Sequence, residues 1–309
     1  RMTTTGEIKA RINSISETKK VTDAMYMISS VKMRKAMADM LKTRPYFTAL
    51  KEEIGEIIKN MPETKNKYLK NADENNELLR RGLLLVTSDK GLAGGYNQNA
   101  IKLALRFIRE NPDTTVFIVG EYGRKYFAHR NLPFVQEFVY SAAIASMWQA
   151  RSVCMDLLEY YDNGKIDDLN IISTGDSVNG SDCALNCLLP LEKSSFACEE
   201  TTDGNAEPKE FYPNAETVLD CVVPSYLFGY IYSSLVDSYF DEQEARMAAM
   251  NVAGENAEDM LKQLNKEFNR VRQAAITNEM VEIASGAKAL KKKAQKKKCE
   301  DDKNEKSNR

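Results

Sequence analysis

The C-terminal part of the chain carries a heptad repeat that only a long, paired helix can satisfy. Apolar or small residues follow one another in alternating steps of three and four: Met247, Met250, Gly254, Ala257, Leu261, Leu264, Phe268, Val271 and Ala275. A 3.5-residue repeat makes one helix supercoil around another. As one helix, residues 226–290 would span on the order of 95 Å, far more than a compact domain needs. The sequence therefore predicts a partner helix.

The N-terminal part of the chain is the predicted partner. Residues 7–44 have a helical pattern, with Thr5 as a plausible N-cap and with an apolar stripe formed by Ile8, Ile12, Ile15, Val21, Met25, Ile28, Met33, Ala36 and Met40. Pro45 is expected to kink or end this helix, because proline lacks a backbone donor and clashes with the preceding turn. A helical pattern then resumes to about residue 60. An antiparallel pairing would leave the end of the longer C-terminal helix without a partner.

The middle of the chain alternates strand and helix patterns, which is typical of a small sheet with parallel pairs. Strand patterns cover residues 81–88, 114–120, 135–138 and 168–173. Helix patterns cover residues 91–110, 124–130 and 141–161. The predicted fold is α/β, with a long antiparallel coiled coil of the N- and C-terminal helices and an inserted Rossmann-like α/β domain. The predicted domains are residues 1–60, 77–213 and 214–290, followed by a disordered tail at 291–309. The segment 176–213 is expected to be an irregular excursion that contains an apolar run at 187–191 and up to two strands.

Composition argues against several classes of protein. The 43 basic and 45 acidic residues nearly cancel, so the chain lacks the overall positive charge of a nucleic-acid binder. Six scattered cysteines and a single histidine, His129, offer no familiar metal-ligand spacing, so we expect reduced thiols and no metal. The apolar run at residues 138–148 is too short to span a bilayer. The N-terminal residues lack an apolar stretch, so no secretory signal is expected.

One turn lies where a phosphate-binding loop would lie. Residues 89–95 (DKGLAGG) follow a strand and precede a helix, the usual place for such a loop. The lysine precedes the glycines, and neither the P-loop nor the GxGxxG pattern is complete. A tight, glycine-dependent turn is the simpler interpretation, whereas nucleotide binding is the alternative and would give the isolated chain affinity for nucleotides. With one histidine and no converging carboxylates, the sequence offers no catalytic site.

Three ordered motifs resemble the gamma subunit of rotary, F-type ATP synthases. They lie at residues 8–36 (IKARI through TKKVTDAM to KMRKA), 87–95 (TSDKGLAGG) and 246–287 (RMAAM through NRVRQAAITNE to SGA). The resemblance covers residues 6–290. It implies a central rotor shaft that turns with proton flow, catalyses nothing itself and drives ATP synthesis or hydrolysis at the beta subunits. It also implies one copy per complex at the cytoplasmic face of a bacterial membrane, with no cofactor.

The resemblance further implies contact residues on the C-terminal helix. The expected partners are the hexamer of alpha and beta subunits, the epsilon subunit and the membrane ring of c subunits. Arg272 and Gln273 match the pair that hydrogen-bonds the catch loop of the hexamer, and Thr277 and Glu279 lie nearby. These residues fall near the end of the helix that is expected to outrun its partner, where polar side chains must meet water or another protein.

A second group of contact residues is implied near the other end of the shaft. Met25 and Lys90 match positions beside the acidic lever segment of the beta subunit, and Lys32, Arg34 and Lys35 would add positive charge facing acidic partners. Lys90 stands where the family commonly has arginine, which keeps the charge but loses the planar fork of donors.

Two alternatives remain open from the sequence alone. The tail at residues 291–309 lies beyond the usual end of the family at Leu290. Charge runs of this kind are usually solvated, and contact with the top of the hexamer or with the peripheral stalk is the alternative. For the whole chain, the alternative is a stand-alone coiled-coil scaffold with an α/β head, which would form a stable monomer or homodimer without other subunits.

Overall fold

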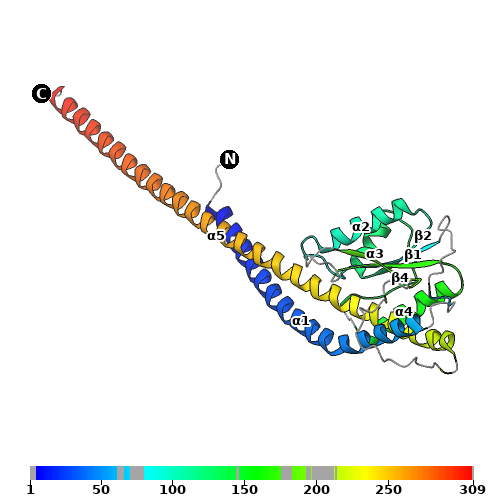
Figure 1. Cartoon of the computed structure of the whole chain (residues 1–309). Helices are drawn as coiled ribbons and strands as arrows, with labels where there is room; N and C mark the ends of the chain where they lie inside the picture. Colours follow the sequence, from blue (N-terminus) through cyan, green and yellow to red (C-terminus); the bar gives the residue numbers. More distant parts are fainter. Residues whose placement is uncertain are drawn as a thin grey trace. The chain divides into compact units, whose positions relative to one another are not determined.

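The fold is known from a computed structural model that describes residues 5–60, 66–69, 80–143, 146–174, 183–192, 196, 212 and 214–307. The elements follow in the order α1 (Thr5–Asn60), β1 (Arg81–Val86), α2 (Tyr96–Glu110), β2 (Thr114–Val119), α3 (Glu121–His129), α4 (Met147–Asp162), β3 (Asp168–Ser173), β4 (Ala184–Leu189) and α5 (Ala215–Ser307) (Figure 1). The chain divides into a helical unit, Arg1–Ala24 with Asn251–Arg309, and a sheet unit, Met25–Met250. The prediction of two long terminal helices with a central sheet domain is confirmed.

The sheet unit contains a four-stranded mixed sheet in the order β2-β1-β3-β4. β1 pairs in parallel with β2 and β3, whereas β4 runs antiparallel to β3. The prediction of a strand at residues 135–138 is wrong. The backbone of this region meets β2 through a hydrogen bond from Val135 N to Val116 O and through one isolated bridge between Tyr140 and Val119. These single contacts do not make a ladder. The edge strand β4 lies in the segment 176–213, for which the sequence predicts up to two strands.

Alternate strand residues pack into two layers, as the two-residue period of a strand requires. Leu83 and Leu85 face α2 and α3 in one core cluster. Leu84 and Phe117 face α4 and the parts of α1 and α5 that belong to the sheet unit. Figure 1 shows α2 and α3 on the side of the sheet opposite α4. Each fully buried side chain of this size contributes roughly 1.5–3 kcal/mol, so the sheet unit has a core on both faces.

Helix α1 passes through Pro45 without a break, so the helix does not end at this residue. The reason is tertiary packing. From Ser29 to Ile57 the inward residues follow steps of four and three without interruption, and all are buried or half-buried: Ser29, Met33, Ala36, Met40, Thr43, Phe47, Leu50, Ile54 and Ile57. Burial of this seam outweighs the single backbone hydrogen bond that Pro45 removes.

Two residues of the predicted apolar stripe on α1 point outward instead. Val21 and Ile28 are 58% and 55% exposed, whereas Thr22 and Ser29 are only 8% and 1% exposed. The hydroxyl of Thr22 donates to Lys19 O within α1, so its burial leaves no hydroxyl donor unpaired. The two helices lie side by side at this seam, because a Cβ added at Gly254 would lie 3.8 Å from Thr22 Oγ1.

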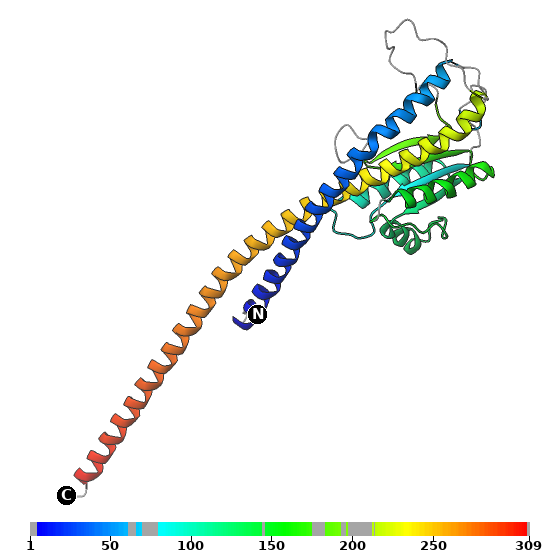
Figure 2. The ribbon, with the colours of Figure 1, turned by 90° about the horizontal axis from the view of Figure 1, so that it is seen from below.

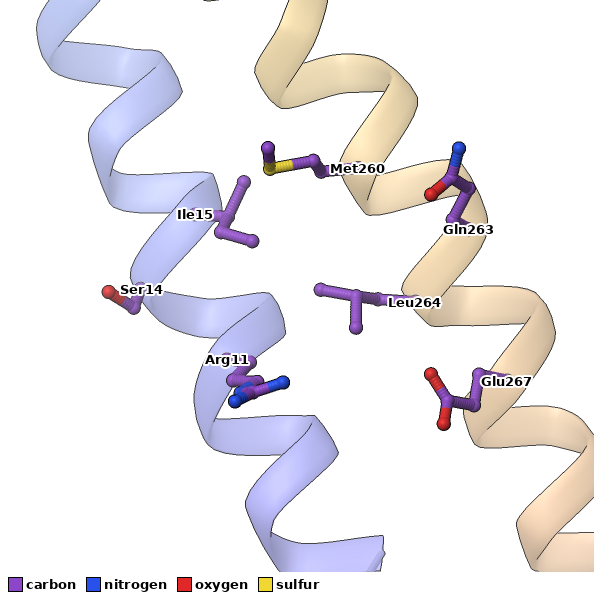
Figure 3. A pocket seen from close by; sticks show the side chains of 7 residues that line it. All are labelled: Arg11, Ser14, Ile15, Met260, Gln263, Leu264 and Glu267. Atoms are coloured by element: carbon purple, nitrogen blue, oxygen red, sulfur yellow. The ribbon is translucent and has the colours of Figure 1, made fainter. Parts of the chain in front are cut away.

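In the helical unit, α1 and α5 run antiparallel. Lys19 Nζ lies 2.9 Å from Glu258 Oε2, and Asp23 faces Gly254. Further toward the start of α1, both helices line an open cavity of about 350 Å³, formed by Arg11, Ser14, Ile15, Met260, Gln263, Leu264 and Glu267 (Figure 3). Rising residue numbers on α1 therefore match falling numbers on α5, as the coiled-coil prediction requires.

Helix α5 is continuous from Ala215 to Ser307, so it begins before residue 226, the start of the long helix considered in the sequence. The predicted seam is confirmed from Met247 to Val271, because each of its residues is buried or half-buried there. Every residue from Arg272 to Lys293 is exposed in the described part of the chain. Figure 2 shows α5 continuing past the start of α1.

The backbone of the C-terminal tail differs from the prediction of disorder. α5 remains helical through Ser307. Neither glycine nor proline follows Gly286, and the lysines, alanines and glutamates of residues 287–307 are strong helix formers.

α5 also contains an apolar 18-residue window with a mean hydropathy of 1.2, of which 44% is buried. Apolar residues of α5 such as Leu219 and Leu227 belong to the core against the sheet, which accounts for hydropathy of this kind.

Candidate partner-contact surfaces

The turn after β1 is the tight, glycine-dependent turn predicted from the sequence. Leu92 and Gly94 both have positive φ angles, of 65° and 53°, a region that favours glycine. α2 begins at Tyr96 rather than at Gly91, because these left-handed residues cannot be part of a right-handed helix. Leu92 carries this conformation although it is not a glycine and its side chain is 64% exposed.

Side chains of α5 cover the place where a sheet of this type would bind a ligand. In open α/β sheets that place is beyond the carboxyl ends of neighbouring strands, here β1 and β3. Arg246 Nη2 donates to the carbonyl oxygens of Lys90 and Gly91 at 3.1 and 3.2 Å. Beyond β3, Ser238 Oγ of α5 accepts from Thr174 N at 3.2 Å. α5 therefore contacts the segments that follow both β1 and β3.

Arg246 forms a buried ion pair with Glu242 one turn earlier on α5. Arg246 Nη2 lies 2.7 Å from Glu242 Oε1, and both side chains are less than a tenth exposed. Burial raises the pKa of Glu242, and the charges of Arg246 and Lys32 partly oppose that rise. Lys32 of α1 thus lies close to the same pair that holds the turn of Lys90.

Hydrogen bonds from other elements fix the start of the same turn. Ser88 N donates to Asn97 Oδ1 of α2 at 2.9 Å. The Asp89 carboxylate accepts hydrogen bonds from Glu121 N, Ser141 Oγ, Ala142 N and Ala143 N at 2.5–3.1 Å. Partial burial by itself would raise the pKa of Asp89, but these hydrogen bonds outweigh it and leave the pKa below its ordinary value.

The predicted contact residues of the sheet unit lie on α1 and on this turn. Met25 is half-buried, whereas Lys32, Arg34, Lys35 and Lys90 are exposed. Arg34 Nε donates to Ser30 O of its own helix at 3.4 Å. Of these residues, Lys32 lies near Glu242 and the backbone of Lys90 binds Arg246, the two members of one ion pair.

The predicted contact residues of the helical unit lie on the exposed part of α5. Arg272, Gln273, Thr277 and Glu279 are all exposed, and Thr277 Oγ1 donates to Gln273 O at 2.9 Å. Arg272 and Glu279 are seven residues apart and share one helix face. The large apolar residues between and beyond them are exposed as well: Ile276, Met280, Val281, Ile283 and Leu290. Exposed apolar surface of this extent is typical of protein contacts.

An exposed apolar face of α1 was missed by the sequence reasoning. Met27, Ile28, Val31 and Leu41 are all exposed. The available signal was that α1 contains more apolar residues than one seam can bury. Met27, Ile28 and Val31 lie beside Lys32 and Lys35, so charge and apolar surface occur together.

Among the described residues, no group of three or more His, Cys, Asp or Glu side chains could hold a metal ion.

Comparison with known proteins relates the whole chain to one family. The family model described as ATP synthase matches residues 4–290. The ATP synthase gamma chain of Acetivibrio thermocellus is 35% identical over 291 residues, which cover 92% of this chain and 98% of the relative. The sodium-ion-specific ATP synthase gamma chain of Acetobacterium woodii is 32% identical over 299 residues, with the same coverage of both chains.

Solved structures share the fold. A chain of the central stalk and c-ring structure of Tetrahymena thermophila mitochondrial ATP synthase gives a TM-score of 0.54 at 19% identity, covering 75% of this chain and 99% of that one. A chain of the OSCP/F1/c-ring structure from Euglena gracilis mitochondrial ATP synthase gives 0.54 at 16% identity, covering 91% and 95%. The long helices, the sheet, the matched motifs and these relatives together show that the chain belongs to the gamma-chain family of ATP synthase.

Proposed function

We propose that this chain acts as the rotor shaft of its ATP synthase through two separate contact surfaces, one in each unit. As a gamma chain, it is the central-stalk subunit that couples rotation to ATP synthesis or hydrolysis. The observation that carries the proposal is the unpaired stretch of α5, where every described residue from Arg272 to Lys293 is exposed. In this proposal the chain contributes no catalytic group, and ATP chemistry takes place at the beta subunits.

The contact surface of the helical unit faces the hexamer of alpha and beta subunits. Arg272, Gln273, Thr277 and Glu279 are the polar contacts, and the apolar side chains around Met280 fill the spaces between them. Exposed ion pairs contribute up to about 1 kcal/mol each. Contacts of this strength orient the shaft inside the hexamer without preventing its rotation.

The contact surface of the sheet unit faces acidic segments of the beta subunits. It consists of Met25, Lys32, Arg34, Lys35 and Lys90. The positive charges of this group attract an acidic partner and speed its association. The exposed apolar side chains of α1 next to these lysines supply the dehydrated part of the same contact.

The remaining partners follow from the kind of assembly. We propose that one copy of the chain contacts the epsilon subunit and the ring of c subunits, at the cytoplasmic face of the cell membrane, with no nucleic acid and no cofactor. The fold shared with chains of structures that contain F1 and a c-ring supports this assignment. A stand-alone scaffold has no such support, because the relatives are gamma chains.

Co-expression with the alpha and beta subunits of the same enzyme tests the proposal. We expect a stable complex with ATPase activity that is lost when this chain is omitted. Arg272→Ala combined with Gln273→Ala should lower that activity roughly three- to tenfold, because two hydrogen-bonding contacts are removed. Lys102→Ala on the exposed face of α2 is the control and should leave the activity unchanged. Failure of the wild-type chain to co-purify with the hexamer would refute the proposal.

A further inference from the structure

The buried ion pair of α5 does not belong to the contact surfaces described above, yet it is joined directly to one of them. Nη2 of the buried Arg246 pairs with Glu242 and also donates to the backbone of the turn, at Lys90 O and Gly91 O. A buried ion pair is costly to desolvate and is weak evidence for stability. The position of this ion pair therefore needs an explanation other than a contribution to stability.

The turn itself is held from three sides and is strained. α2 binds Ser88 through Asn97, the segment at 141–143 binds Asp89, and α5 binds the next two carbonyls through Arg246. Leu92 keeps a positive φ of 65°, which costs free energy and persists only where the surroundings enforce it. The side chains of Lys90 and Leu92 nevertheless point into solvent.

α5 also touches the turn by direct packing. A Cβ added at Gly94 would lie 3.8 Å from Ala245 O, so the turn lies next to the helix at this residue. The backbone of the turn is thus fixed to the helix that forms the shaft, while its two exposed side chains are left available for a partner.

We propose that Arg246, held in place by Glu242, is a positioning residue that keeps Lys90 and Leu92 in a preformed arrangement for contact with an acidic and partly apolar surface of the beta subunit. Pre-organisation of this kind lowers the entropy cost of binding. The inference rests on the proposed function, because it assumes that Lys90 faces the hexamer. It adds that the strength of that contact is set by a residue which the hexamer does not touch.

The test uses the complete complex and a variant that preserves both the fold and the net charge. Glu242→Leu with Arg246→Met replaces the buried pair by apolar side chains of similar volume, a change that is often neutral for stability. It removes one positive and one negative charge, so the net charge is unchanged. Lys90→Gln serves as the reference, because it removes the contacting charge itself.

The readout is the affinity of the chain for the alpha–beta hexamer, measured at several salt concentrations. Lys90→Gln should weaken binding roughly fivefold at low salt and flatten the salt dependence, as loss of an exposed ion pair does. The double variant should flatten the salt dependence to the same degree although Lys90 is present, and combining it with Lys90→Gln should add no further loss. A purely structural role would lower the thermal midpoint and leave the salt dependence at the wild-type slope.

Two results would separate the possible failures. If the double variant keeps the wild-type salt dependence, or if its effect multiplies with that of Lys90→Gln, the positioning role is wrong while the proposed function stands. If wild-type chain does not bind the hexamer at all, the proposed function itself fails. Arg246→Lys keeps the charge beside Glu242 but lacks the fork of donors. Its salt dependence of binding should lie between those of the wild type and the double variant.

Discussion

At the scale of single residues, polar side chains decide where the backbone of this protein is fixed. Asp89 is an example, because its carboxylate accepts hydrogen bonds from two separate segments, at Glu121 and at 141–143. Thr22 and Ser29 are another, because they occupy buried seam positions next to exposed Val21 and Ile28. In both cases the size and hydrogen bonding of a side chain matter more than its hydropathy.

Asp89→Asn should lower the free energy of unfolding by about 2 kcal/mol at pH 7, the scale of hydrogen bonds to a charged acceptor. The pKa of Asp89 in the folded chain lies below the ordinary 3.8, so the unfolded chain binds more protons between those two values. The contribution of Asp89 is therefore complete above pH 3.8 and is lost as the pH falls through the folded pKa. Denaturant unfolding of both proteins from pH 7 to pH 3 measures this. A difference that stays constant over that range would contradict the prediction.

Thiol alkylation should distinguish the cysteines by burial. Cys154 is buried, and burial raises its pKa to about 12, so almost no thiolate forms at pH 8. Cys187 and Cys221 are exposed. In a variant with Cys198→Ser and Cys299→Ser, iodoacetamide should modify Cys187 and Cys221 at least roughly tenfold faster than Cys154. Peptide mass spectrometry follows each site, and equal rates would show that Cys154 is accessible.

At the scale of elements, the two long helices are shaped by what they pack against. α1 remains helical through Pro45 because Phe47 inserts beside Gly229 of α5, where it also meets the rings of Phe228 and Tyr232. An aromatic ring packed against a glycine leaves no room for a larger residue. This contact fixes the register of α1 against α5 within the sheet unit.

Gly229→Ala should destabilise the sheet unit by about 1–3 kcal/mol, the usual cost of overpacking. A Cβ at this position would lie 1.9 Å from Phe47 Cδ1, so the ring must move. Gly254→Ala is the matched control on the same helix: its Cβ would meet only Asp23 Oδ1 at 3.4 Å and Thr22 Oγ1 at 3.8 Å. That control should be neutral or stabilising by up to about 1 kcal/mol, since alanine favours helix. Thermal unfolding by circular dichroism compares the two, and equal midpoints would refute the packing argument.

At the scale of the whole molecule, the family accounts for the chain only up to its tail. The family model ends at residue 290, and relatives that are 98% covered leave 8% of this chain unmatched. The C-terminal residues therefore add length to α5, which is helical through Ser307, beyond the surfaces assigned to contacts.

Deletion of residues 291–309 should leave assembly with the alpha and beta subunits and ATP hydrolysis unchanged within about twofold. The physical reason is that a lysine-rich run is well solvated and gains little from contact. ATPase assays and co-purification of the truncated complex measure this. The control is Arg272→Ala with Gln273→Ala in the full-length chain, which should lower activity under the same conditions. A larger loss from the deletion would favour contact between the tail and the hexamer or the peripheral stalk.

The sequence by itself determined the features that depend on local period and local geometry. The seam from Met247 to Val271, the strands at 81–86, 114–119 and 168–173, and the glycine-dependent turn all follow from short-range patterns. Each pattern is repeated or chemically restrictive enough to allow one backbone solution. The exposure of Arg272 and its neighbours follows in the same way, from the greater length of the C-terminal helix.

Only the tertiary structure decided which of several locally acceptable arrangements is adopted. Propensity favours a helix end at Pro45 and burial of Val21 and Ile28, but packing against α5 selects a continuous helix with Thr22 and Ser29 inside. β4 has no clear strand pattern and forms because β3 offers an unpaired edge. The bond from Arg246 to the turn joins residues 156 positions apart. Contacts over that distance depend on the whole fold, because no local pattern encodes the partner of a side chain.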